Sequence, residues 1–155
     1  MTSPEADTRA EAEAILARIA ASSDAEIDIA EGALALAALD RPQVSLARYR
    51  AHLTELAEEV AREGGRGLEE GSERAAVLAR VVFGRYGYEG DRLSYDDLQN
   101  ANLMRVIDRR KGLPVALGIL MIHASRPVAS GARITRRCAS AAGRSVRRQK
   151  DCGRR

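Results

Sequence analysis

The chain has few aromatic residues and few of the side chains that bind metals. Tryptophan is absent from its 155 residues and Phe83 is the single phenylalanine, so we do not expect a large platform for a flat aromatic ligand. His52 and His123 lie far apart, and neither a CxxC nor an HxxxH spacing occurs. Because metal sites gather several such ligands at short spacings, we expect no metal and no cofactor.

Cysteines and long apolar runs are equally scarce. Cys138 and Cys152 are the only cysteines, which excludes a disulfide framework within residues 1–126. The longest apolar candidate, Leu113–Ala124, is shorter than the roughly 18–20 residues that span a bilayer, and it predicts a core helix. The Ala- and Glu-rich N-terminus does not resemble a signal peptide. We therefore expect a cytoplasmic protein that does not bind membranes.

Charge is divided unevenly along the chain. The formal net charge is +3, but residues 127–155 carry nine basic residues and one acid, whereas residues 1–126 carry 16 basic and 21 acidic residues. The segment 127–155 also lacks leucine, methionine and aromatic residues, so it cannot bury enough apolar surface to offset its ordering entropy. We expect an acidic folded region over residues 1–126 and a disordered basic tail over residues 127–155.

The periodicity of apolar residues predicts a mostly α fold. Ser23–Glu26 fits a capping box that would open the second helix, and Ser45 and Ser72 can cap the third and fourth. Leu46, Tyr49, Leu53, Leu56 and Val60 form the clearest amphipathic stripe. No strand-like alternation precedes residue 126. Helices are expected over residues 9–21, 25–39, 46–60, 72–86, 98–108 and 113–126.

Few polar side chains stand out as candidates for chemistry. His123 lies on an apolar helix and is expected in the core or at its boundary, while His52 lies off the apolar stripe and is expected in solvent. The pairs Glu58–Glu59 and Glu69–Glu70 are expected to be solvated. The glycine-rich loop Gly64–Gly71 has no GK[ST] ending, so it does not predict a phosphate-binding loop.

Arg109, Arg110 and Lys111 precede a helix N-terminus, where basic residues do not complement the helix dipole. Two explanations are open, an anion site or ion pairs with nearby acids. We favour ion pairs with Asp96, Asp97 or Asp108. The arginine-rich tail offers a separate, non-specific route to nucleic acid, although it lacks the interleaved aromatic residues that stack on bases.

Two blocks resemble a known family. Val82–Asp91 resembles a pattern of Leu-Phe followed by Gly-Phe-x-Gly-Asn, and Leu98–Leu117 resembles Asn-Ser-Tyr-Leu-x-x-Val-Leu-x-Arg-Arg-x-Gly-Ile-Pro-Ile-Ser-Leu. Both patterns are those of the SirB-one N-terminal-domain family, a branch of the transglutaminase-like superfamily. The resemblance extends over roughly residues 10–126. The residues that carry the motif, with structural or anion-binding roles, are Asn100, Asn102, Asp108, Arg109, Arg110, Gly112 and Pro114.

The resemblance implies a papain-like α+β scaffold, here reduced to its helical N-terminal half. Active members of the superfamily begin their central helix with a cysteine, and a histidine and an aspartate follow on later strands. The matching helix start here is Leu113-Pro114-Val115-Ala116, without a cysteine. The resemblance therefore implies a non-catalytic regulatory or protein-interaction domain with an unidentified protein partner. A cysteine-protease-like or transglutaminase enzyme is the alternative, and it would have to use Cys138 or Cys152.

The resemblance ends after Arg126. The family continues with Ala-Arg-Arg-Leu-Gly-x-Pro and then with strands that contain Pro-Gly-His-Phe, and none of these occurs here. We interpret the tail as the product of a frameshift near residues 125–127, which translation of the gene in three frames would test. A truncated product would lack the sheet that covers the 113–126 helix. We then expect marginal stability and an exposed apolar face formed by some of Val115, Leu117, Ile119, Leu120 and Ile122.

Overall fold

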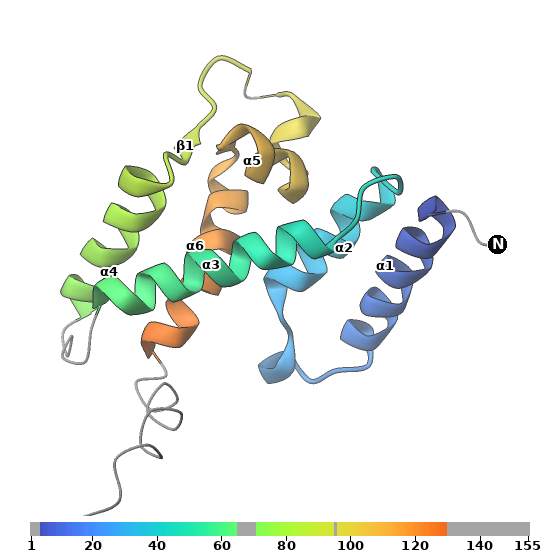
Figure 1. Ribbon diagram of the computed structural model, residues 1–155, viewed down its shortest axis with the longest axis horizontal. Coiled ribbons are helices and arrows are strands. Elements are labelled where there is room, and N and C mark those ends of the chain that lie inside the picture. The colour runs from blue at the N-terminus through green and yellow to red at the C-terminus, as the bar shows by residue number, and fades with distance from the viewer. Residues whose placement is uncertain (1–3, 65–70, 95, 130–155) are drawn as a thin grey trace, which may run out of the picture.

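The fold is helical, as the periodicity predicts. The computed structural model describes residues 4–64, 71–94 and 96–129 (Figure 1). Over these residues the helices are α1 (Pro4–Ala20), α2 (Ile29–Leu39), α3 (Ala47–Gly64), α4 (Gly71–Ala79), α5 (Leu103–Arg109) and α6 (Pro114–Ala129). Shorter turns are η1 (Asp24–Glu26), η2 (Arg80–Arg85) and η3 (Leu98–Asn100), of which η2 is π-helical and the other two are 3₁₀.

The second helix begins later than the sequence predicts. The capping box of Ser23 and Glu26 is present, but it begins the short turn η1 and not α2. The chain then becomes extended, and Asp28 starts α2 by accepting hydrogen bonds from the backbone N–H groups of Ala30 and Glu31. An aspartate satisfies free helix N–H groups well, and it therefore sets a new helix start at Ile29.

Helix α3 organises the core. It crosses the molecule in front of α6, and these two helices share the most extensive helix–helix contact (Figure 1). The expected apolar stripe is confirmed, because Leu46, Tyr49, Leu53, Leu56 and Val60 are all buried. Helices α1 and α2 pack on each other at one end of α3, and α4 lies at the other end (Figure 1). Burial of each large aliphatic side chain in such a core contributes about 1.5–3 kcal/mol.

Two very short strands correct the expectation of a chain without strands. β1 (Glu89–Gly90) pairs in parallel with β2 (Lys111–Gly112), and Glu89 lies opposite Lys111. The N–H of Glu89 donates to the carbonyl of Arg110 at 2.9 Å, and the N–H of Asp91 donates to the carbonyl of Gly112 at 3.2 Å. Strands of two residues leave too little sequence for an alternating pattern to be visible. Their pairing holds the two motif blocks side by side.

Helix α6 begins at Pro114, which suits a first helical turn, and ends at Ala129, beyond the expected end near Arg126. Two of the five apolar side chains from which an exposed face was expected are exposed. Val115 and Ile122 are 66% and 48% exposed, whereas Leu117 and Leu120 are buried against the helical core. None of the helices in the described ranges has both the length and the apolar character needed to cross a bilayer.

The expectations for residues 130–155 lie outside the described residues, and so do those for Glu69, Glu70, Cys138 and Cys152. Ser72 lies within α4 and not before it, because that helix begins at Gly71.

Candidate functional site

The segment from Asn100 to Pro114 joins α2, α3, β1 and α6. Asn100 is fully buried and bonds in three directions. Its amide Nδ2 donates to the carbonyl of Ser94 at 2.6 Å, and its Oδ1 accepts from Nη1 of Arg109 at 3.1 Å. Its backbone carbonyl accepts from the N–H of Leu113 at 3.1 Å. Asn100 thus fixes the loop before η3 to the start of α6, which is a structural role.

Asn102 connects α5 to α2. Its Oδ1 accepts from the N–H of Arg105 at 3.2 Å and caps the start of α5. Its Nδ2 donates to the carbonyl of Ala37 at 3.2 Å and to Oδ2 of Asp40 at 3.3 Å. Because both ends of the amide are used within the protein, Asn102 has a structural role as well.

Asp108 connects α5 to α3 and to the loop before α3. Arg41 Nη1 donates to its Oδ2 at 2.8 Å, the hydroxyl of buried Tyr49 donates to the same oxygen at 3.0 Å, and Arg48 donates to Oδ1. Burial would raise the pKa of Asp108, but the hydrogen bonds from Arg41 and Tyr49 hold that pKa below its ordinary value. The charged form of Asp108 therefore helps to hold α5 against α3.

Arg109 and Lys111 form ion pairs, but with other acids than those expected. Nη2 of Arg109 donates to Oδ2 of Asp91 at 3.0 Å, and Nζ of Lys111 lies 2.8 Å from Oε1 of Glu89. Hydrogen bonds from the backbone N–H groups of Ser94 and Leu93 lower the pKa of Asp91 to about 2. The partners are acids, as expected, but the expected pairs with Asp96, Asp97 or Asp108 are wrong. Asp108 binds Arg41 and Arg48, and the β1–β2 pairing places Lys111 beside Glu89.

A steric constraint explains why residue 112 is a glycine. A Cβ atom there would lie 2.6 Å from Cγ2 of Val106, which is fully buried and stiff because it is β-branched. Only glycine lets the backbone of β2 pass this close to α5.

Arg110 differs from its neighbours in both backbone and side chain. It follows α5 in the left-handed conformation, with φ 59°. Its guanidinium lies over the rings of Tyr88 and Tyr86, 4.8 and 5.6 Å from their centroids. Nη1 donates to the hydroxyl of Tyr88 at 2.6 Å and lies 2.8 Å from Nε2 of His52. Cation–π contact and hydrogen bonds together fix the orientation of this group.

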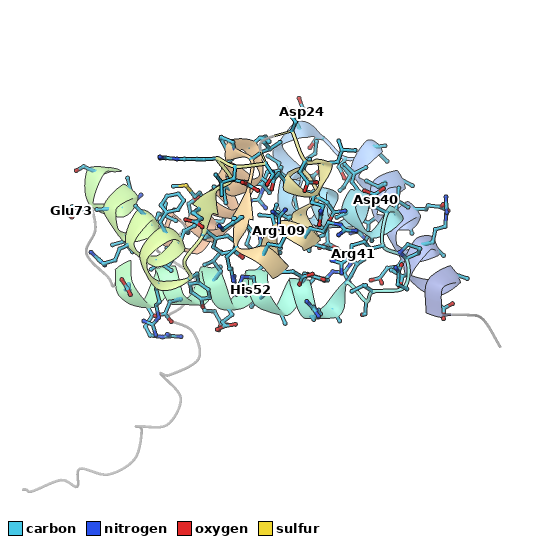
Figure 2. The ribbon with its side chains drawn as sticks, turned by 90° about the horizontal axis from the view of Figure 1, so that it is seen from above. Asp24, Asp40, Arg41, His52, Glu73 and Arg109 are labelled. Atoms are coloured by element: carbon cyan, nitrogen blue, oxygen red, sulfur yellow. The ribbon has the colours of Figure 1, made fainter. Side chains whose placement is uncertain are left out.

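His52 corrects a sequence expectation, because it is half-buried and not solvated. Its Nε2 lies 2.8 Å from the hydroxyl of Tyr88, and its ring meets the ring of Tyr86 edge-on at 5.6 Å. Burial and the adjacent charge of Arg110 lower the pKa of His52. Burial raises the pKa of Tyr88 to about 12, so both rings are neutral near pH 7. In Figure 2, His52 and Arg109 lie in the central part of the molecule, between α4 and α1.

The cluster of His52, Tyr86, Tyr88 and Arg110, here called the Arg110 cluster, continues along α3. The hydroxyl of Tyr86 donates to Oε1 of Glu55 at 3.2 Å. Glu59, which was expected in solvent, is 5% exposed and binds Arg85 at 2.5 Å as well as Arg62. It is buried because η2 packs against α3 and supplies Arg85 as a counter-ion.

The sequence did not indicate Tyr86, Tyr88 and His52 as residues of a candidate site. Their role depends on the π-helical turn η2, where the N–H of Tyr86 donates to the carbonyl of Val81, and on Gly87, which has φ 68°. Gly87, between the two tyrosines, is the sequence feature that could have indicated this arrangement, because a left-handed residue there turns Tyr88 back towards the core. In the ranges that the structure describes, no group of three or more His, Cys, Asp or Glu residues could hold a metal ion.

Comparison with known proteins gives two matches. A family model described as "Transglutaminase-like superfamily" matches residues 47–132, more than half of the chain. A protein named "UPF0162 protein" from Vibrio cholerae serotype O1 is 34% identical over 97 residues, which cover 63% of this chain and 36% of that protein. The chain thus spans only about a third of the length of this relative. No solved structure matches.

Proposed function

Because the chain belongs to the transglutaminase-like superfamily, we propose that it is a non-catalytic, regulatory protein-interaction domain of that superfamily. We also propose that it belongs to the SirB-one branch, on the motif of Leu98–Leu117.

The start of α6 carries this proposal. The matching helix of the active enzymes resembled by this chain begins with a cysteine, and here the positions are Leu113, Pro114 and Val115. A thiolate or another activated nucleophile is the first requirement of that chemistry. Pro114 and Val115 provide no such group, and both are exposed.

The only histidine in the Arg110 cluster also argues against nucleophilic catalysis. Nε2 of His52 is occupied by the hydroxyl of Tyr88 and by Nη1 of Arg110. A general base must reach the proton of a nucleophile, and the group that His52 meets is a phenol whose pKa is raised by burial. The same groups are well suited to binding, because they hold a guanidinium at a half-exposed position.

Two measurements on the purified full chain test the proposal. In the first, ammonia release and amine incorporation are followed with glutamine-containing peptides and with a competent transglutaminase as positive control. We expect no turnover by the chain, and none by a Cys138→Ala/Cys152→Ala variant. Turnover that this double variant loses would overturn the proposal in favour of the enzyme alternative.

In the second, proteins recovered with the tagged chain from producing cells are purified and recombined with it, and the dissociation constant is measured by calorimetry. We expect at least one purified protein to bind saturably at a defined stoichiometry. Failure of every recovered protein to bind after purification would contradict the interaction role.

A further inference from the structure

The guanidinium groups along α3 fall into two kinds. Arg48, Arg80 and Arg85 each lie against a carboxylate, namely Asp108, Glu63 and Glu59 in turn. Arg110 has a phenol hydroxyl and an imidazole as its partners, and no carboxylate within the described part of the chain. It is a half-buried cation held by neutral groups.

Only one side of the Arg110 guanidinium is used. Both of its hydrogen-bond partners are met by Nη1, and no described residue bonds to Nε or Nη2. The Nε and Nη2 edge of an arginine presents two parallel N–H groups, which match the two oxygens of one carboxylate. The rings of Tyr86 and Tyr88 fix the plane of this edge in advance, so little side-chain entropy remains to be lost on binding.

The backbone of Arg110 supports the same view. Among the described residues it is the sole non-glycine with positive φ. This conformation is unfavourable for a residue with a Cβ, and helices that end in it carry glycine or asparagine most often. A non-glycine residue held there at a cost is typical of sites where the side chain itself is needed.

We propose that the Nε and Nη2 edge of Arg110 binds a carboxylate, supplied by an acidic side chain of the protein partner. The inference rests on the proposed function only for the source of that carboxylate. A singly charged group is favoured over a phosphate dianion because Glu55, which accepts a hydrogen bond from the hydroxyl of Tyr86, already places one negative charge beside the cluster. A dianion would add two further charges at close range.

Nuclear magnetic resonance on the full chain tests this site directly. His52 reports on it, since a carboxylate that neutralises Arg110 removes one of the two causes that lower the pKa of His52. The groups facing that ring are Tyr86, Tyr88, Arg110 and Glu55. Sodium acetate is compared with sodium chloride and sodium phosphate at equal ionic strength, and His52→Gln assigns the resonance.

We expect acetate to shift the Nε–Hε resonance of Arg110 saturably and to raise the pKa of His52, and chloride to do neither. Arg110→Asn, which suits the left-handed backbone, should abolish both effects while the amide spectrum stays folded. Equal responses to acetate and chloride would overturn the proposal, and a stronger response to phosphate would overturn the choice of carboxylate.

The source of the carboxylate is tested with two blocked tripeptides, Ala-Glu-Ala and Ala-Gln-Ala. Binding of the glutamate peptide but not of the glutamine peptide supports an acidic side chain. Binding of acetate without the glutamate peptide would instead assign the site to small free carboxylates and overturn the assigned source. If acetate binds and no protein partner is found, the site stands and the proposed function fails. If a partner is found and acetate does not bind, the proposed function stands and the carboxylate site at Arg110 fails.

Discussion

Asp108 and Arg110 are two residues apart, yet among the described residues Asp108 is paired with opposite charges and Arg110 is not. The carboxylate of Asp108 receives hydrogen bonds from Arg41, Arg48 and Tyr49 and is satisfied within the protein. The guanidinium of Arg110 keeps one edge unpaired by any described residue. At the scale of the residue, the motif therefore contains charges that are paired within the protein and one cation, Arg110, that no described carboxylate pairs.

Asp108→Asn is expected to destabilise the fold by about 1–3 kcal/mol, because Arg41 and Arg48 would lose a charged partner and an amide nitrogen would face them. Urea denaturation at pH 7 measures the change. The exposed Glu58→Gln, on the same helix α3, is the matched control and should change the free energy of unfolding by less than about 0.5 kcal/mol. Equal effects of the two substitutions would show that Asp108 is not structural.

Acidification is expected to destabilise the protein through His52. The pKa of His52 is lowered in the folded state, so below its ordinary value of about 6.5 the unfolded chain binds more protons than the folded one. Stability is then present above that pH and is lost as the pH falls towards the folded pKa. Denaturation at pH 7.5 and 5.5 measures this loss, which should be smaller in His52→Gln. A loss of the same size in both proteins would contradict the assignment.

Among the elements, those with their own periodicity were predictable. The stripe of α3 and the Pro114 start of α6 could be read directly, because both depend on local spacing. The π-helical turn, the β1–β2 pairing and the burial of Glu59 could not, since each depends on segments brought together by the whole fold.

The candidate site was predictable in the same partial way. Asn100, Asn102 and Asp108 have structural contacts, as a shared motif suggests, but their partners are spread over the fold. Asn100 binds Ser94, Asn102 binds α2 and Asp108 binds Tyr49 of α3. His52 carried no sequence signal beyond its position off the apolar stripe. It is recruited by Tyr88 from a block 36 residues away.

Two glycines test the packing of the elements. Gly112→Ala would place a Cβ 2.6 Å from Val106, so we expect a loss of about 1–3 kcal/mol. Gly118→Ala, within α6 and with no atom beyond its chain neighbours and its own helix backbone within 4 Å of the added Cβ, should be neutral or stabilise by up to about 1 kcal/mol. Thermal unfolding of the two variants measures both effects. Similar melting temperatures would contradict the close approach of β2 to α5.

At the scale of the whole molecule, α6 is buried on one side and open on the other. Leu120 is fully buried, while Val115 and Ile122 remain exposed on the outer face. Apolar side chains presented in this way favour association. The family model matches this region, since the matching segment begins at the start of α3 and includes all of α6.

Val115→Asp combined with Ile122→Asp is expected to weaken self-association of the chain without loss of stability, because both side chains are exposed. Sedimentation velocity over a concentration series measures association. Leu120→Ala is the buried counterpart and should cost about 2–5 kcal/mol of stability. Unchanged sedimentation of the double variant would show that this face does not drive association.

The free energy of unfolding of Arg110→Asn tests most directly whether Arg110 serves binding and not the fold. Asparagine tolerates the left-handed backbone at φ 59°, which offsets part of the lost contacts with Tyr86, Tyr88 and His52. We predict that urea denaturation gives a value within about 1 kcal/mol of the parent chain. A loss of about 3 kcal/mol or more, as for a buried core residue, would contradict the assignment of Arg110 to binding.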